Sequence, residues 1–280
     1  MQYALKFLRI NDMCDLLGLS FNVPITAKIS LDVFQQRGQA NPDGWGLAFY
    51  KKDRLQIIKE ADSAVNSNLF DFMEKYTRSK TIISHVRRST RGVPSYLNTH
   101  PFYRHMRTGT IDREFAFAHN GTLTQLEKLR FKKYQPLGDT DSEQAFCYLL
   151  DILSEREAIT WAESDFKVIK ETLRDINDGK NTLNCIFSDG SFLFCYSDEN
   201  DHNNGLRFTK QYAPFGSIEL VARDERLGSV ELRSEIPSAL DQSGYLISTR
   251  ILTSGEWTEF TEGELIVFKD GHIVYPQSRI

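Results

Sequence analysis

The sequence predicts an α+β fold in which the β-strands pair mostly antiparallel. Short apolar runs rich in β-forming residues recur along the 280 residues, and turn-forming residues separate several neighbouring runs. Apolar residues at helical spacing occur in only a few places between them. Strands joined by tight hairpins pair antiparallel, whereas a doubly wound parallel sheet needs a crossover helix between its strands. The pattern therefore favours α+β layers.

The expected strands are the short runs with strong β propensity. They are Leu16–Ser20, Trp45–Tyr50, Leu55–Lys59, Thr81–Arg87, Phe115–His119, Leu183–Ser188, Phe192–Ser197, Tyr245–Thr249, Leu265–Lys269 and His272–Tyr275. Ser188-Asp189-Gly190 and Lys269-Asp270-Gly271 each lie between two of these runs. Because Asp-Gly pairs are typical of hairpin turns, we expect two β-hairpins there.

The expected helices are the segments that carry apolar stripes at a spacing of three or four residues. The first stripe is Val65, Leu69, Phe72 and Tyr76, the second is Phe146, Leu149, Leu150 and Leu153, and the third is Phe166, Ile169, Leu173 and Ile176. These stripes predict amphipathic helices inserted between the strands.

Composition restricts the classes of partner. The net charge of −4 provides no positive field to hold a polyanion, so nucleic acid and acidic membrane surfaces are poor candidates, and a small polar metabolite is favoured. The four cysteines form no CxxC pair and no disulfide framework, which indicates reduced thiols. Neither a signal peptide nor a transmembrane span is recognised. We therefore expect a cytoplasmic protein.

Cys14 is a candidate nucleophile because it directly follows Met13 and precedes an expected strand. If translation begins at Met13 and this methionine is removed, Cys14 has both a thiol and a free α-amine. The reference pKa values of an α-amine and a thiol are about 7.7–8.0 and about 8.5, so they can exchange a proton near neutral pH. One residue would then supply nucleophile and base. The alternative is a buried cysteine behind an ordinary N-terminal extension.

Three further segments offer groups for a polar substrate. Arg87 ends an expected strand, and a guanidinium binds a carboxylate through two parallel hydrogen bonds; the alternative is a surface arginine. Asn120-Gly121 could donate hydrogen bonds to an oxyanion, or it could be a simple hairpin turn. Asp141 could bind a substrate ammonium group, or it could be the N-cap of the helix that follows.

The remaining polar residues near these segments are expected to support the site. His85, His100 and His119 have no carboxylates at metal-ligand spacing around them, so we expect structural roles for them and no metal. Thr90 and His85 belong to the segment that contains Arg87, and we expect them, with His100, to hold the reacting groups in place. No phosphate loop or dinucleotide fingerprint is present, so no cofactor is expected.

Taken together and in order, these segments resemble the class II glutamine amidotransferase domain, and most closely its stand-alone members that begin Met-Cys-x-Leu-Leu-Gly. The matching motifs are the Asp-Gly-Trp-Gly at 43–46, His-x-Arg at 85–87, Asn-Thr-His-Pro-Phe at 98–102, His-Asn-Gly at 119–121, Thr-Asp-Ser-Glu at 140–143 and Ala-Pro-Phe-Gly at 213–216. One such motif is weak, but the ordered set extends over most of the chain.

The resemblance implies the fold and the roles of individual residues. It implies a four-layer α/β/β/α sandwich with two central antiparallel sheets, which is the N-terminal-nucleophile hydrolase fold. Cys14 would attack a γ-glutamyl amide with its own α-amine as base, and the side chain of Asn120 with the backbone N–H of Gly121 would form the oxyanion hole. Arg87 would bind the substrate α-carboxylate, and Asp141 its α-ammonium group. Glutamate would leave after hydrolysis of a thioester.

Two features depart from the family pattern. The twelve residues before Met13 would deprive Cys14 of its amine, so we expect residues 1–13 to be an extension that precedes the true start or is cleaved, and 14–280 to be one domain with a decorated C-terminal part. Arg88 occupies a position where ammonia-channelling members usually have an aromatic residue. No acceptor-using synthase domain is recognised after Glu143.

Three functions therefore stay open at this point. The first is a hydrolase of glutamine or another γ-glutamyl compound that works alone. The second is a subunit of a larger amidotransferase or γ-glutamyl-peptide-degrading complex, with a partner subunit. The third is an inert γ-glutamyl-binding protein, in which the extension before Cys14 abolishes catalysis.

Overall fold

The computed structural model describes residues 14–29, 41–89, 92–109, 111–200, 205–215, 217–222, 225–234, 241–253 and 255–280. The predictions made for the extension 1–13, for Thr90 and for Gly216 lie outside these residues. In the described part, the strands form two antiparallel sheets of nine and six strands. No helix described there is long and apolar enough to cross a bilayer.

The nine-stranded sheet has the order β13-β9-β12-β1-β4-β2-β3, and β10 and β11 continue from β1. Its strands are β1 (Asp15–Ile29), β2 (Trp45–Lys51), β3 (Arg54–Glu60), β4 (Ser79–Val86), β9 (Arg207–Tyr212), β10 (Ser217–Ala222), β11 (Glu225–Ser234), β12 (Ser243–Ser248) and β13 (Thr258–Glu259). We call it the first sheet. Its central strand β1 pairs with both β4 and β12, so the residues at the start of β1 are held from both sides.

The six-stranded sheet has the order β15-β14-β8-β7-β6-β5. Its strands are β5 (Phe102–Thr108), β6 (Ile111–Asn120), β7 (Asn184–Ser188), β8 (Leu193–Tyr196), β14 (Leu265–Lys269) and β15 (His272–Tyr275). We call it the second sheet. The predicted hairpins at 188–190 and 269–271 are confirmed, because β7 pairs with β8 and β14 pairs with β15 across these turns.

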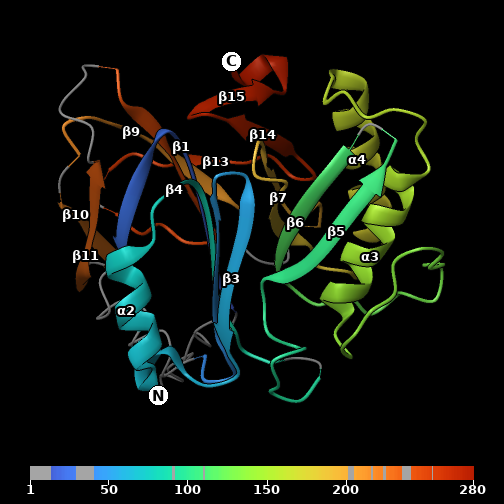
Figure 1. The fold of residues 1–280 in the computed structure, drawn as a ribbon, viewed down its shortest axis with the longest axis horizontal. Helices are drawn as coiled ribbons and strands as arrows, with labels where there is room; N and C mark the ends of the chain where they lie inside the picture. The colour runs from blue at the N-terminus through green and yellow to red at the C-terminus, as the bar shows by residue number, and fades with distance from the viewer. Residues whose placement is uncertain are drawn as a thin grey trace, which may run out of the picture.

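The helices cover the outer faces of the two sheets (Figure 1). They are α2 (Asn68–Tyr76), α3 (Asp141–Ser154) and α4 (Glu163–Ile176), with short 3₁₀ turns η1 (Ala64–Asn66) and η2 (Gln277–Arg279). Helix α2 lies against the first sheet, and α3 and α4 lie against the second. The predicted α+β fold and its four-layer α/β/β/α arrangement are therefore confirmed.

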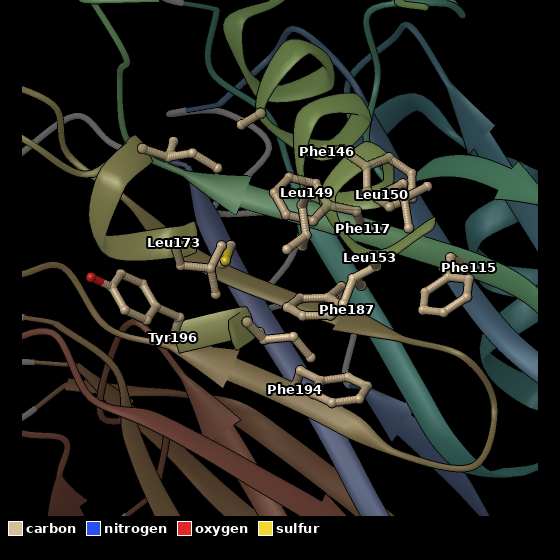
Figure 2. Packing of buried hydrophobic residues seen from close by; sticks show 14 of the residues in the cluster. Phe115, Phe117, Phe146, Leu149, Leu150, Leu153, Leu173, Phe187, Phe194 and Tyr196 are labelled. Atoms are coloured by element: carbon tan, nitrogen blue, oxygen red, sulfur yellow. The ribbon is translucent and has the colours of Figure 1, made fainter. Parts of the chain in front are cut away.

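Three apolar cores join these layers. Between the sheets, small and branched side chains such as Ala118 and Ile186 of the second sheet pack with Leu16 and Ile83 of the first. Between the second sheet and its helices, aromatic rings fill the space, and Figure 2 shows Phe117, Phe187 and Phe194 facing the α3 residues Phe146 and Leu149. The rings of Phe117 and Phe146 are stacked at 5.0 Å. The predicted stripes of α3 and α4 are thus buried, as amphipathic helices require.

The stripe of α2 has a different environment. The helix forms where it is predicted, but Leu69, Phe72 and Tyr76 are 39%, 56% and 64% exposed. Among the side chains that the structure describes in this region, Met73 and Ala64 of η1 belong to the core of the first sheet instead. The predicted residues Leu69, Phe72 and Tyr76 therefore lie outside that core.

Several strands were not predicted, namely β5, β9, β10, β11 and β13. Strand β5 shows the physical reason. It reads Phe-Tyr-Arg-His-Met-Arg-Thr, with only Phe102 and Met106 buried, because it is an edge strand whose other residues meet solvent. Charged residues therefore interrupt the apolar run by which central strands are recognised.

Candidate active site

Cys14 lies at the start of β1, where the end of β4 encloses its thiol. The backbone N–H of Arg88 donates to Cys14 Sγ at 3.1 Å, and the thiol donates to the Arg88 carbonyl oxygen at 3.3 Å. Burial raises the pKa of the Cys14 thiol to about 11. At neutral pH the sulfur therefore carries its proton, and a nucleophilic role requires a base close by.

Asn120 and Gly121, at the end of β6 in the second sheet, lie close to Cys14. Asn120 is the last residue of β6, and its side-chain Nδ2 donates a hydrogen bond to the carbonyl oxygen of Cys14. Gly121 has a φ of +155°, and a Cβ atom there would collide with the carbonyl oxygen of Thr182. The position therefore requires glycine. This close packing fixes the backbone of 120–121 beside the thiol.

Arg87 follows the last residue of β4 and is only 2% exposed, so its interpretation as a surface arginine is wrong. Its backbone N–H donates to the Gly44 carbonyl at 2.7 Å. Its guanidinium donates to the carbonyls of Asp43 and Gly92 at 3.4 and 3.3 Å. The Asp43 side chain in turn accepts from the N–H of Ser89 at 2.7 Å. The Asp-Gly-Trp-Gly motif thus accepts hydrogen bonds from the backbone and the guanidinium of Arg87 and holds this residue in place.

Asp141 is the first residue of α3, and the N-cap is Thr140, whose hydroxyl accepts from the N–H of Glu143 at 3.2 Å. The interpretation of Asp141 as the N-cap is therefore wrong. Its carboxylate accepts instead from the N–H groups of Leu123 at 2.7 Å and Ser142 at 2.9 Å. These bonds hold a nearly buried negative charge at the positive end of the helix dipole.

The three buried histidines are neutral. Burial lowers the pKa of His85 to about 3 and lowers those of His100 and His119. His119 Nε2 donates to the Thr182 carbonyl at 2.9 Å, so its Nδ1 accepts from the Ser142 hydroxyl at 2.8 Å. His85 Nε2 donates to the His119 carbonyl at 3.1 Å, and its ring packs on that of His100 at 4.3 Å. A buried imidazole that resists protonation is a poor general base at neutral pH.

These elements enclose one small cavity of about 20 Å³, roughly the space of one water molecule. Its lining residues are Cys14, Arg87, Arg88, His100, His119, Gly121, Thr140, Asp141 and Ser142. The structure thus brings together Cys14, Arg87, Gly121, Asp141 and His100, while His85 lies behind His100. A larger groove of about 460 Å³ at the end of α4 is lined by acidic and amide side chains and by Arg174, and no described cysteine or histidine lines it. The small cavity is therefore the better candidate for the active site.

Comparison with known families shows where this chain belongs. The sequence model of the glutamine amidotransferases class-II matches residues 13–279. The chain belongs to this family. YafJ of Escherichia coli K12 is 32% identical over 91% of this chain and 100% of its own length. The Methanocaldococcus jannaschii protein MJ1515 is 39% identical over 96% of this chain and 72% of its own.

A solved structure is also similar to this class-II family member. The crystal structure of a predicted glutamine amidotransferase from Pseudomonas aeruginosa superposes with a TM-score of 0.70 at 28% identity. It covers 94% of this chain and 100% of the Pseudomonas chain. The likeness thus extends over the described sheets and helices.

Some residues at the candidate site of this chain were given no role in the sequence analysis. Thr140 and Ser142 flank Asp141 in the cavity wall, and the Thr-Asp-Ser-Glu motif that contains them was the available signal. Arg250 lies beside the start of β1 through an ion pair with Asp15. The sequence separation of 235 residues leaves no local signal for that contact.

Proposed function

We propose that this chain hydrolyses the γ-amide of glutamine or of another γ-glutamyl compound through a thioester on Cys14, in a form in which Cys14 is the N-terminal residue. The main support is the position of a protonated thiol in a cavity that Arg87, Gly121 and Asp141 also line. The family match, which begins at residue 13, also supports it.

The α-amine of Cys14 is the proposed base. The imidazoles in the cavity wall have lowered pKa values, and the Asp141 carboxylate is engaged by two backbone N–H groups. An α-amine, with a pKa of about 7.7–8.0, titrates in the required range. It takes the thiol proton as sulfur attacks the γ-carbonyl carbon and delivers it to the leaving nitrogen when the C–N bond breaks. Water then cleaves the thioester, which releases glutamate and restores the thiol.

The remaining residues would stabilise charge. As the γ-carbonyl oxygen becomes negative, the Asn120 side chain and the Gly121 N–H donate to it. Arg87 holds the α-carboxylate and Asp141 the α-ammonium group, so that the γ-amide faces Cys14. The cavity is smaller than a substrate, so binding also requires its walls to move apart.

The nature of the acceptor is a separate part of the proposal. We favour water as the final acceptor, so that ammonia or a larger amine is released with glutamate. A partner subunit that consumes the released amine is the second candidate, because family members include amidotransferases. The inert alternative is unattractive because Cys14, Arg87, Gly121 and Asp141 line one cavity, with Asn120 bonded to the Cys14 carbonyl beside it.

The first prediction tests the base. A chain produced to begin at Cys14 should release glutamate from glutamine, whereas the 280-residue chain with Met1 retained should be slower by about 10²–10⁴-fold, the usual contribution of a general base. An amide nitrogen at Cys14 cannot accept the proton. Intact mass identifies each form, and coupled glutamate detection gives the rates. Equal turnover numbers for the two forms would exclude the α-amine as base.

The second prediction concerns Arg87. Arg87→Lys should raise KM for glutamine by about tenfold or more with a smaller change in kcat, because a point charge replaces a two-pronged grip on the carboxylate. Arg207→Lys is the matched control, since it changes an arginine paired with Glu259 at 2.7 Å on strand β9. If Arg87→Lys and Arg207→Lys had the same KM as the unmodified chain, Arg87 would not bind the substrate.

A further inference from the structure

The residue after Cys14 forms an ion pair with a residue from the far end of the chain. Arg250 Nε donates to Asp15 Oδ1 at 2.6 Å, across 235 residues of sequence. The Asp15 side chain is 11% exposed and that of Arg250 is 30% exposed, so solvent screens the pair only partly. The other oxygen of Asp15 accepts from Asn41 Nδ2 at 3.3 Å.

The backbone beside Arg250 also holds the start of β1. Thr249 N–H donates to the Leu16 carbonyl at 3.2 Å, and the Leu16 N–H donates to Thr249 Oγ1 at 3.3 Å. On its other side, Asp15 is the register partner of Val86 in β4. Backbone bonds and the ion pair with Arg250 thus hold Asp15, and a small displacement of Asp15 would be passed directly to Cys14.

The ion pair also has an electrostatic consequence. Burial is the main reason for the raised pKa of the Cys14 thiol, the Arg88 N–H opposes it, the charge of Asp15 raises it further and Arg87 lowers it. Among the described residues, the other charged groups at the cavity are Arg88 after the end of β4 and Asp141 from α3, and Asp43 supports Arg87 from the 41–44 turn. Arg250 forms an ion pair with Asp15, the carboxylate nearest in sequence to the nucleophile.

We propose that Arg250 is a positioning residue for catalysis, which acts through Asp15 to hold Cys14 in place and to offset the negative charge beside its thiol and α-amine. As far as it concerns turnover, this inference rests on the proposed function. Its electrostatic part concerns the cysteine alone and can be measured without a substrate.

Because Asp15 and Arg250 carry opposite charges, their single substitutions should shift the pKa values of the thiol and the α-amine in opposite directions. Arg250→Gln removes a positive charge next to Asp15, which favours the protonated thiol and amine and raises both pKa values. Asp15→Asn removes a negative charge next to Cys14 and lowers them. The double variant should lie close to the unmodified chain. If Arg250 has only a structural role, both single variants should be impaired, but their pKa shifts should not have opposite signs.

The first readout is the alkylation of Cys14 by iodoacetamide, followed by peptide mapping. At pH 8, Arg250→Gln should slow alkylation by roughly threefold for each unit of raised pKa, since the loss of thiolate is partly offset by its greater nucleophilicity. Asp15→Asn should accelerate it, and the double variant should restore the original rate. The second readout is the acid limb of the pH profile of kcat/KM, which should move up by about one pH unit in Arg250→Gln and down in Asp15→Asn.

Arg279→Gln is the matched control, because Arg279 of η2 and Glu264, which precedes β14, form a comparably buried pair, 23% and 9% exposed. It should leave both readouts unchanged. Arg250→Lys, which keeps the charge, should shift them less than Arg250→Gln and serves if the glutamine variant does not fold. Shifts of the same sign in both single variants, or no shifts, would overturn the proposal. If the unmodified chain releases no glutamate, the proposed function fails, and the alkylation cycle still decides the role of Arg250.

Discussion

Cys14→Ser should lower the rate of glutamate release by at least about a thousandfold in a chain that begins at this residue. An alcohol is a far weaker nucleophile than a thiol at neutral pH, and the same modest amine would have to activate it. Removal of a covalent nucleophile in other hydrolases costs up to about 10⁶ in kcat. Binding should survive, because Arg87 and Asp141 are untouched. Turnover and glutamine binding by calorimetry separate the two effects.

The other cysteines provide the control for this prediction. Cys147, Cys185 and Cys195 are buried, and burial raises their pKa values. A diazo-ketone shaped like glutamine should add one equivalent to Cys14 and spare these three. Cys147→Ser, on the buried face of α3, should keep its activity if it folds. An adduct on another cysteine, or full activity of Cys14→Ser, would remove Cys14 from the mechanism.

The fold was predictable because most central strands contain short apolar runs that are buried. All of Asn184–Ser188 and Leu193–Tyr196 is buried, so short runs there could be recognised without knowledge of their partners. The edge strand β5 was missed because its polar residues face solvent. A strand buried on both faces is recognised from a few consecutive apolar residues. An edge strand such as β5 lacks such a run.

The candidate site was predictable to the extent that its residues belong to compact motifs. Arg87 and Gly121 lie at strand ends, and Asp141 begins a helix, so the motif order placed them well. The contacts around each residue were harder to predict from the sequence. Arg87 donates to the carbonyls of Asp43 and Gly92, and the tautomer of His119 is set by the distant Thr182 carbonyl. These contacts arise only when segments distant in the sequence come together in the fold.

The contact between Asn120 and Cys14 underlies the last prediction. Asn120→Ala should lower kcat by about 10²–10³, equivalent to about 2.7–4 kcal/mol, with little change in KM, because the amide donor is needed most when the carbonyl oxygen is negative. Steady-state glutamate release measures both constants. Asn22→Ala is the matched control, since Asn22 Nδ2 donates to the Asp241 carbonyl at 2.6 Å farther along β1. It should leave kcat unchanged.

The same side chain also binds the Cys14 carbonyl, so a loss of activity in Asn120→Ala has two physical explanations. Alkylation by iodoacetamide distinguishes them, because that reaction needs a correctly placed thiol but develops no oxyanion on a carbonyl. If Asn120 acts on the transition state, the variant should be alkylated at Cys14 at nearly the original rate while kcat falls. If alkylation and turnover fall together, Asn120 holds the cysteine in place instead. A kcat within about threefold of the original would show that neither role limits the reaction, since even one lost oxyanion donor normally costs far more.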